Sequence, residues 1–259
     1  MVFEWVSTFL VNLVDPILSP LLKLNPVLSI FIITVILATA STLIYKYNTD
    51  QKKLKEIKDK QKADQKKLKA IKDPKEKMAY QKKMMSKNMA MSKEMMGQSF
   101  KPKVMILSML PILLLFPWFY ANLAFEPILP GQDFSVVLDL DVGLDGVVST
   151  MAPNGLVVLG NTTMIPNADN KVWFNYTAEK FGEHEIEFEV AGVPYYQTVK
   201  VDAYKYLNPI QERDSTDQVK KITTVHKKLE VIGSWGWLGS YILFSVILSM
   251  VIRKLLKVY

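Results

Sequence analysis

The sequence predicts a membrane protein with a three-helix transmembrane core, a cytoplasmic helical hairpin and an external all-β domain. Three runs of residues, 24–45, 104–125 and 231–252, contain no charged side chain. A helix of about 20 apolar residues is long enough to cross the hydrocarbon core of a bilayer, which is about 30 Å thick. The connection after the first run is rich in lysine, and the connection after the second alternates apolar and polar residues over short stretches. A soluble fold is therefore not expected.

Charge divides the chain in the same way as hydropathy. Residues 46–103 carry 19 lysines against seven acidic residues, and residues 104–231 carry nine basic residues against 16 acidic ones. Because lysine and arginine collect on the cytoplasmic flanks of membrane helices, the basic segment and the tail 253–259 are predicted to be cytoplasmic. The N-terminus and the acidic segment then lie outside. We therefore predict a multi-pass protein of the cell membrane with spans at 24–45, 104–124 and 232–252.

The N-terminal segment, residues 1–23, differs from a standard signal peptide. It has Glu4 where a basic residue would be expected, and Asp15 and Pro16 interrupt its apolar run. Apolar residues recur at steps of three and four, as in Leu10, Leu13 and Ile17. This spacing predicts an amphipathic helix that lies on the outer membrane surface. A fourth span and an uncleaved signal anchor remain open alternatives.

The basic segment contains an internal repeat that predicts a coiled-coil hairpin. Residues 51–59 recur as residues 65–73 with an offset of two heptads. The a and d positions are held by Leu54, Ile57, Leu68 and Ile71. Gln61 and Asp64 occupy the intervening a and d positions, which weakens the seam. Asp73 and Pro74 then form a helix start, so residues 46–103 are predicted to contain two antiparallel helices.

Methionines form a stripe on the second predicted helix of the hairpin. Its members are Met78, Met85, Met89 and Met96. Methionine is flexible and polarizable and suits surfaces that accept varied apolar partners. The stripe therefore predicts a site for hydrophobic client segments, and packing against the first helix is the alternative. The lysines would set topology, attract anionic lipid or contact ribosomal RNA without reading its sequence, since no aromatic residues interleave with them.

The three spans contain mild polar residues but no internal ionisable side chain, which argues against a pump, a proton relay or a voltage sensor. The polar residues follow one face of each helix. The groove-lining candidates are Thr34, Ser41, Tyr45, Ser108, Asn122, Tyr241 and Ser245. Hydroxyl groups on one face most often mediate contact between membrane helices. The alternative is a shared, partly hydrated groove between the three spans.

The acidic segment reads as β structure over residues 125–208. Alternating stretches bounded by turn residues predict strands at 134–140, 147–151, 156–159, 172–177, 184–190 and 195–203. Short strands at this density favour a small immunoglobulin-like sandwich. Asn161 and Asn175 begin glycosylation sequons. Within the linker 209–231, residues 214–230 are predicted to be helical, with Val219, Ile222 and Leu229 on one side.

Several classes of chemistry are absent from the sequence. The chain has no cysteine and only two histidines, so thiol nucleophiles, disulfides, iron–sulfur clusters and multi-histidine metal sites are not expected. A phosphate-binding GxxxxGK[ST] loop is also absent. We therefore expect a protein that is not an enzyme and needs neither a cofactor nor a metal ion.

The layout resembles the archaeal YidC-like branch of the YidC/Oxa/Alb superfamily of membrane insertases, whose relatives include the insertase subunit of the ER membrane complex. The most specific stretch is residues 73–85, which continues through the methionines into the second span. The resemblance covers residues 1–124 and 232–259, and the β segment looks like an addition. It implies membrane-protein insertion through a groove open to lipid, with nascent membrane-protein clients captured by the hairpin. Bacterial members typically carry an arginine in this groove, and the predicted spans contain none.

Two other functions remain open at the level of sequence. The first is a membrane-anchored structural or receptor protein that displays an external β module and dimerises through its coil. The second is a transporter, which three spans without buried charge disfavour. The predicted partners of an insertase are nascent clients and the lipid bilayer, with the ribosome as a further candidate.

Overall fold

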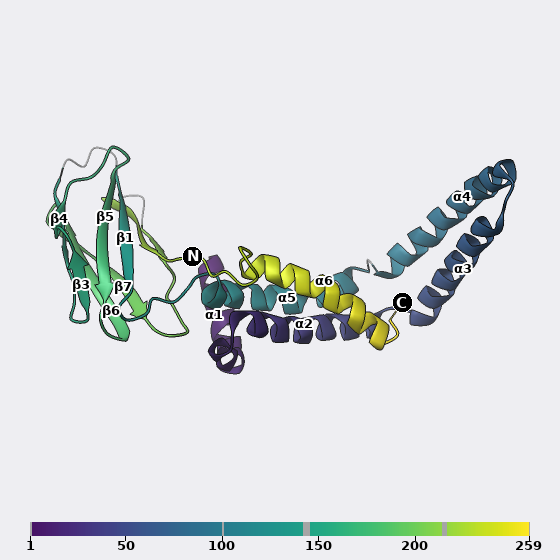
Figure 1. The fold of residues 1–259 in the computed structure, drawn as a ribbon, viewed down its shortest axis with the longest axis horizontal. Helices are drawn as coiled ribbons and strands as arrows, with labels where there is room; N and C mark the ends of the chain where they lie inside the picture. Colours follow the sequence, from purple (N-terminus) through teal and green to yellow (C-terminus); the bar gives the residue numbers. More distant parts are fainter. Residues whose placement is uncertain (1, 100, 142–145, 214–216, 259) are drawn as a thin grey trace. The chain divides into compact units, whose positions relative to one another are not determined.

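A computed structural model describes residues 2–99, 101–141, 146–213 and 217–258 of the chain (Figure 1). The chain divides into two compact units. Unit 1 comprises Met1–Ser29 and Pro117–Leu238, and unit 2 comprises Ile30–Phe116 and Gly239–Tyr259. Unit 1 holds the β structure, and unit 2 holds most of the apolar helices and the lysine-rich hairpin. The two units are described separately.

Among the described residues, three helices are long and apolar enough to cross a membrane by length and composition. They are α2 (Pro26–Asn48), α5 (Pro102–Leu123) and α6 (Trp237–Leu255). Both α2 and α5 begin with proline, which suits the first helical position because its missing N–H would have no helical partner there. Their bounds agree with the predicted first and second spans to within a few residues.

The third apolar helix begins five residues later than predicted. A tight turn precedes it, in which the N–H of Val231 donates to the carbonyl of Trp235 and Gly233 adopts a φ of 57°. Glycine tolerates this left-handed conformation without strain, so residues 232–236 are taken up by the turn. Trp237 then starts α6 and stacks on Phe119 at 5.4 Å between ring centroids. At its other end α6 extends to Leu255 and so includes Arg253 and Lys254.

The N-terminal segment is helical, as α1 (Val2–Leu18) followed by the 3-10 helix η1 (Ser19–Lys23). Side chains of residues 2–7 lie outside the described residues. Asp15, which interrupts the apolar run, accepts hydrogen bonds from Trp118 Nε1 at 3.0 Å and Lys205 Nζ at 2.6 Å. Leu13 and Ile17 are exposed. The polar interruption therefore serves the packing of unit 1, while part of the apolar face stays uncovered in the described chain.

In unit 2, α3 (Gln51–Ala70) and α4 (Pro74–Ser99) form a helical hairpin, visible in Figure 1. Two aspartates cap the helix starts: Asp50 accepts the N–H of Lys53 and Asp73 accepts the N–H of Lys75. The predicted seam is only partly buried, because Leu54 and Ile57 are buried whereas Leu68 and Ile71 are half-buried.

Asp64, which is predicted to weaken this seam, instead connects the two helices of the hairpin. It is 7% exposed, lies 2.8 Å from Lys87 Nζ, and accepts a hydrogen bond from the Tyr80 hydroxyl at 3.3 Å. The hydrogen bond from Lys87 holds the pKa of Asp64 below its usual range. A polar contact therefore takes the place of an apolar one in the middle of the hairpin.

The described part of unit 1 forms two antiparallel sheets. The five-stranded sheet has the order β3-β5-β1-β9-β8 and the four-stranded sheet has the order β4-β2-β6-β7. The strands are β1 (Asp133–Leu140), β2 (Val148–Met151), β3 (Leu156–Leu159), β4 (Thr163–Met164), β5 (Lys171–Ala178), β6 (Gly182–Val190), β7 (Val193–Val201), β8 (Ile210–Glu212) and β9 (Val219–Val225). The six predicted strands therefore appear with small shifts, and β4, β8 and β9 were not predicted.

The two sheets share one core. Phe174 of β5 and Phe188 of β6 are buried, with 5.8 Å between their ring centroids. The Tyr176 hydroxyl lies 2.6 Å from Thr150 Oγ1, so a strand of each sheet contributes to one buried hydrogen bond. Alternate residues of β5 and β6 face this core, which is why their sequences alternate.

The predicted helix at 214–230 is wrong. Residues 217–230 contain the strand β9, and residues 214–216 lie outside the described residues. The pairing of β1 with β9 slips at a bulge, so that Asp139 faces Lys221 while Leu140 faces Val219. A bulge adds one residue to a strand, and so Val219 and Ile222, three residues apart, are both buried. This spacing imitates one face of a helix.

Candidate functional site

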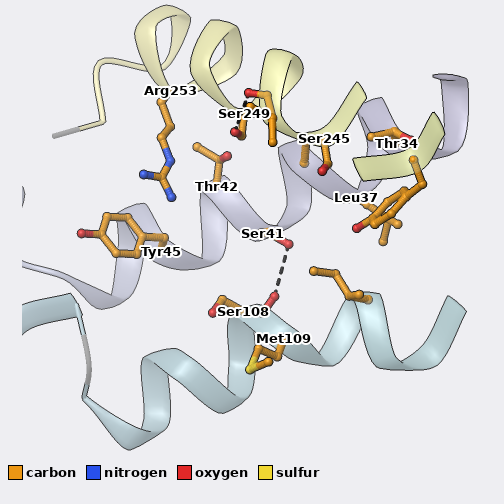
Figure 2. Close-up of a pocket in the computed structure, with 14 residues that line it drawn as sticks. Thr34, Leu37, Ser41, Thr42, Tyr45, Ser108, Met109, Ser245, Ser249 and Arg253 are labelled. Atoms are coloured by element: carbon orange, nitrogen blue, oxygen red, sulfur yellow. Dashed lines mark hydrogen bonds between the residues drawn. The ribbon is translucent and has the colours of Figure 1, made fainter. Parts of the chain in front are cut away.

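A cavity of about 330 Å³ lies between α2, α5 and α6 within unit 2 (Figure 2). Hydroxyl groups and aliphatic side chains from all three helices surround it. The lining residues are Thr34, Leu37, Ala38, Ser41, Thr42, Tyr45, Ser108, Met109, Ile112, Tyr241, Ser245, Val246, Ser249 and Arg253. We call this the hydroxyl cavity.

Several serine and threonine hydroxyl groups around the cavity donate hydrogen bonds to backbone carbonyls of their own helices. Ser245 Oγ donates to the carbonyl of Ile242 at 2.9 Å, and Ser249 Oγ donates to that of Val246 at 3.0 Å. Thr34 Oγ1 donates in the same way, to the carbonyl of Ile30 at 2.6 Å. A hydroxyl group has one hydrogen to donate and two lone pairs to accept with. The hydroxyl cavity is therefore lined mainly by acceptors, which can bind water or the N–H and O–H groups of a ligand.

Contacts between neighbouring helices hold the walls of the hydroxyl cavity in place. Ser41 Oγ of α2 donates to the carbonyl of Ser108 in α5 at 3.3 Å, as Figure 2 shows. Tyr241 of α6 meets Phe116 of α5 edge to face, with 6.3 Å between ring centroids. Such aromatic pairs fix both distance and orientation. The three helices thus enclose polar groups that are already in place before any ligand arrives.

Arg253 is the functional candidate that sequence reasoning missed. It was predicted to lie in the tail beyond the third span, but α6 includes it and its guanidinium carbon lies 5.4 Å from the ring centroid of Tyr45. Figure 2 shows it reaching toward Tyr45 at one end of the hydroxyl cavity. The sequence does indicate that Arg253 shares a helix face with the polar residues of the third span, because Tyr241, Ser245, Ser249 and Arg253 recur at steps of four. The cavity therefore carries a positive charge.

Six of the seven predicted groove residues line the hydroxyl cavity, and Asn122 does not. Asn122 is buried in unit 1, where its Nδ2 donates to the carbonyl of Trp118 at 3.0 Å. It lines a different recess of about 210 Å³ with Leu22 and Tyr204. Ser108 and Asn122 share a helical face but lie 14 residues apart, or about 21 Å along α5 at 1.5 Å per residue.

The predicted methionine stripe is exposed on α4. The exposed fractions are 63% for Met78, 67% for Met85, 68% for Met89 and 56% for Met96. The hairpin is packed instead by Met91, which is buried along with Leu54 and Ile57 of α3. We call Met78, Met85, Met89 and Met96 the methionine face. Packing between α3 and α4 therefore does not explain why methionines occupy this face.

Two further predictions concern sites outside the apolar helices. Asn161 lies in an exposed loop, whereas Asn175 lies within β5, where its Oδ1 accepts a 2.6 Å hydrogen bond from Ser135 Oγ. Over the described ranges of the chain, no group of three or more His, Cys, Asp or Glu side chains could hold a metal ion.

Residues 12–202 match the model of a family described as EMC3/TMCO1-like integral membrane proteins, and the chain belongs to this family. The family is associated with membrane-protein insertion. No curated protein and no solved structure matches the chain. The proposed resemblance to the archaeal YidC-like branch is therefore wrong: the EMC3/TMCO1-like family is a different family, related in function as insertase-like. The matched residues run through β1–β7, which had been read as an addition to the shared layout, and end before α6.

Proposed function

We propose that this EMC3/TMCO1-like membrane protein inserts hydrophobic segments of nascent membrane proteins into the bilayer. The observation that carries the proposal is the hydroxyl cavity between three apolar helices. The methionine face captures the apolar segment, and the cavity accommodates the polar residues beside it. The chain acts without catalysis, a cofactor or a metal ion, because the free energy comes from burial of the client's own apolar surface in lipid.

The cavity would lower the barrier for a polar flank to enter the membrane. A peptide group or side chain that loses water in hydrocarbon costs several kcal/mol unless it finds a hydrogen-bonding partner. The hydroxyl acceptors supply partners for N–H groups, and Arg253 supplies donors and a positive charge for carboxylates. Clients with acidic or neutral flanks should therefore use the cavity more readily than clients with lysine-rich flanks.

The methionine face suits clients of varied sequence. Unbranched thioether side chains adjust to different apolar surfaces at little cost in packing. The four side chains are exposed, so a client would find them uncovered. Lysines surround them on α4, and these would attract acidic residues or phosphates near the client.

The proposed topology places the hairpin where proteins are made. The hairpin and the end of α6 are cytoplasmic, and the N-terminus and the β region lie outside the cell membrane, because lysine is concentrated in residues 46–103. In the same proposal, α3 and α4 act as a short coiled coil, and the two sheets form an immunoglobulin-like module. Segment 1–23 lies on the outer surface with Leu13 and Ile17 toward lipid.

Site-specific cross-linking tests this proposal. A photoreactive amino acid at Met89 or Ser108 should form adducts with ribosome-bound nascent membrane proteins, and the same probe at Lys82 on α4 should form far fewer. The full-length protein in its native membrane is used. Adducts at neither Met89 nor Ser108, for several client proteins, would refute insertion as the function.

A second experiment tests the cavity itself. Replacing Ser245 and Ser249 together with Ala removes two acceptors with little change in volume, and insertion of a client with an acidic flank should fall by at least about fivefold, as expected from the loss of about 1 kcal/mol for one hydrogen bond. Clients with wholly apolar flanks should be unaffected. The matched control replaces Ser86 and Ser92, which are exposed on α4. Equal losses for both kinds of client would argue against a role for the cavity in polar passage.

A receptor or structural role is the second candidate, favoured by one observation on the β region. Leu159 on β3 and Trp173 on the neighbouring strand β5 are 40% and 46% exposed, and neighbouring exposed apolar side chains can form a contact surface for a partner. A receptor would form stable dimers through the hairpin and give no client adducts. Sedimentation of the purified protein in detergent separates this outcome from a monomeric insertase.

A further inference from the structure

A second recess in unit 2 is lined almost wholly by positive charge. Its volume is about 450 Å³, and it lies between α3 and the end of α6. The basic side chains are Lys58 and Lys62 of α3 and Arg253, Lys254 and Lys257 at the end of α6. Met250 and Val258 complete the lining, and none of the described residues that line the recess is acidic. We call this the basic recess.

A turn at the end of α6 fixes the backbone of three of the basic residues that line the recess: Arg253, Lys254 and Lys257. The N–H of Val258 donates to the carbonyl of Arg253 at 2.9 Å, and the N–H of Lys257 donates to that of Lys254 at 3.3 Å. This pair of hydrogen bonds is the Schellman ending, whose left-handed residue is usually glycine. Here that residue is Lys257, with a φ of 50°. The turn therefore places a lysine side chain at a position that is usually occupied by glycine, which has no side chain.

A further contact holds this turn against α2. Lys46 Nζ donates to the carbonyl of Leu256 at 3.0 Å, which satisfies one of the carbonyls left free at the helix end and brings another positive charge to it. Val258 is buried in the turn. The end of α6 is thus a defined structure, and its cations are not spread along a free tail.

The charge and the surroundings of the basic recess select its ligand. Five like charges around one recess repel each other, so an anion that sits among them is stabilised. The recess also includes Met250, which belongs to a helix long and apolar enough to span a membrane, and the buried Val258. A ligand with a phosphate group joined to apolar chains matches both features. We propose that the basic recess binds the phosphate headgroup of an anionic membrane lipid.

The inference can be tested independently of insertion, because only Arg253 lines both the basic recess and the hydroxyl cavity. The test therefore leaves Arg253 unchanged and replaces Lys62, Lys254 and Lys257 with Gln. The matched control replaces Lys75, Lys82 and Lys83, which are exposed on α4 and do not line the recess, and so removes the same number of positive charges.

Native mass spectrometry of the full-length protein in detergent gives the dissociation constants for added phosphatidylglycerol and phosphatidylcholine. The unaltered protein and the control should bind phosphatidylglycerol at least about tenfold more tightly than phosphatidylcholine, since each nearby cation contributes about fivefold. The Lys62→Gln, Lys254→Gln, Lys257→Gln variant should lose most of this preference. Equal affinity for the two lipids in the unaltered protein, or an equal loss in the control, would overturn the inference.

Two competition measurements identify the source of the phosphate. Millimolar inorganic phosphate should leave phosphatidylglycerol bound, because it lacks the apolar chains; its displacement of the lipid would show a free-phosphate site and reject lipid as the ligand. Binding of a 20-nucleotide RNA is followed by fluorescence anisotropy. If the variant loses RNA affinity while its lipid preference is intact, the recess is a nucleic-acid surface and the lipid assignment is wrong.

Discussion

Large apolar side chains form a buried core in the β region but are exposed on one face of the hairpin. In the β region, Phe174 and Phe188 from two sheets are 1% and 0% exposed. In the hairpin, Met85 and Met89 are 67% and 68% exposed, although they occupy helical positions at which apolar residues normally face a partner. The difference shows that apolar composition alone does not identify a core.

The two regions also depend on different amounts of burial for their stability. The two sheets enclose a continuous core, whereas the hairpin depends on Leu54, Ile57 and Met91, with polar contacts at Asp64 and between Lys53 and Glu94. A hairpin with so little burial opens at low cost. The following predictions test this contrast, from the largest expected effect to the smallest.

Replacing Phe174 with Ala should destabilise the β region by about 3–5 kcal/mol, the usual cost of deleting a buried aromatic ring. The loss of stability is measured as a shift in the urea midpoint of the full-length protein in detergent, with unfolding detected by thermolysin cleavage within residues 146–213. The control Glu185→Ala lies on the solvent side of β6 and should shift stability by less than about 0.5 kcal/mol. An unchanged midpoint for Phe174→Ala would mean that the two sheets do not share a core.

Replacing Leu54 with Ala should cost the hairpin about 2 kcal/mol, the lower end of the range for a buried leucine, because two helices can close around the gap. Hydrogen exchange measured by mass spectrometry should become faster across residues 51–97 and stay unchanged in β1 and β5. The exposed Lys66 gives the control, Lys66→Ala. Faster exchange in both regions would show that the hairpin and the β region unfold together.

Acid should loosen the hairpin through Asp64. The hydrogen bond from Lys87 lowers the pKa of this carboxyl in the folded chain, so its stabilising effect is present above the unfolded value of 3.8 and is lost as the pH falls through the lower folded value. Because the chain has no cysteine, Lys60→Cys and Lys83→Cys accept spin labels, and their distance distribution should broaden below about pH 4. In an Asp64→Asn background the distribution should be equally broad at every pH. A narrow, pH-independent distribution in that background would contradict the assignment.

Mild acid should weaken unit 1 through His226. Burial lowers the pKa of this imidazole, whose Nδ1 lies 3.2 Å from the carbonyl of Glu126 and whose ring lies beside Phe125 and Tyr206. The unfolded chain, with the ordinary value of 6.5, then binds the proton more readily, so stability is full above pH 6.5 and falls as the pH drops toward the folded value. The urea midpoint should be lower at pH 5.5 than at pH 7.5. His226→Gln should reduce this difference, and an unchanged difference would assign it to other groups.

Replacing the methionine face should change stability least of all. Each of Met78, Met85, Met89 and Met96 is exposed, so substitution by Gln, which has a similar volume, should alter the stability of the hairpin by less than about 0.5 kcal/mol. Client cross-linking at Ser108 should nonetheless fall by at least about tenfold when all four are replaced, since several CH₂-equivalents of client burial are lost at about 0.8 kcal/mol each. Loss of helicity by circular dichroism would show that the face has a packing role after all.

Local patterns predicted most of the fold because each element obeys a local rule. Strict alternation gave β5 and β6, uncharged length gave α2 and α5, and the Asp73-Pro74 start gave α4. The predictions of secondary structure were wrong where a single residue interrupts the local pattern. A bulge opposite Asp139 made β9 look helical, and a glycine turn delayed the start of α6.

The candidate site was predictable in part for the same reason. Hydroxyl stripes on each span placed six residues around the hydroxyl cavity, because residues at steps of three and four share a helix face. The stripes could not show where the cavity ends, which is why Asn122 was included and Arg253 was left out. Exposure of the methionine face was also beyond the sequence, since Met91 and Met89 differ by two positions and only the pairing of α3 with α4 decides which of them is buried.

Asp15 has a consequence for the order of events during synthesis. Its two partners, Trp118 and Lys205, lie 103 and 190 positions further along the chain. At the usual 5–20 residues per second, Trp118 is synthesised about 5–20 s after Asp15 and Lys205 about 10–40 s after it. The N-terminal helix therefore lacks both contacts until Trp118 is made, and lacks the Lys205 contact for the whole of the longer interval. The contacts of a helix near the start of the sequence are thus complete only after a residue beyond β7 has been synthesised.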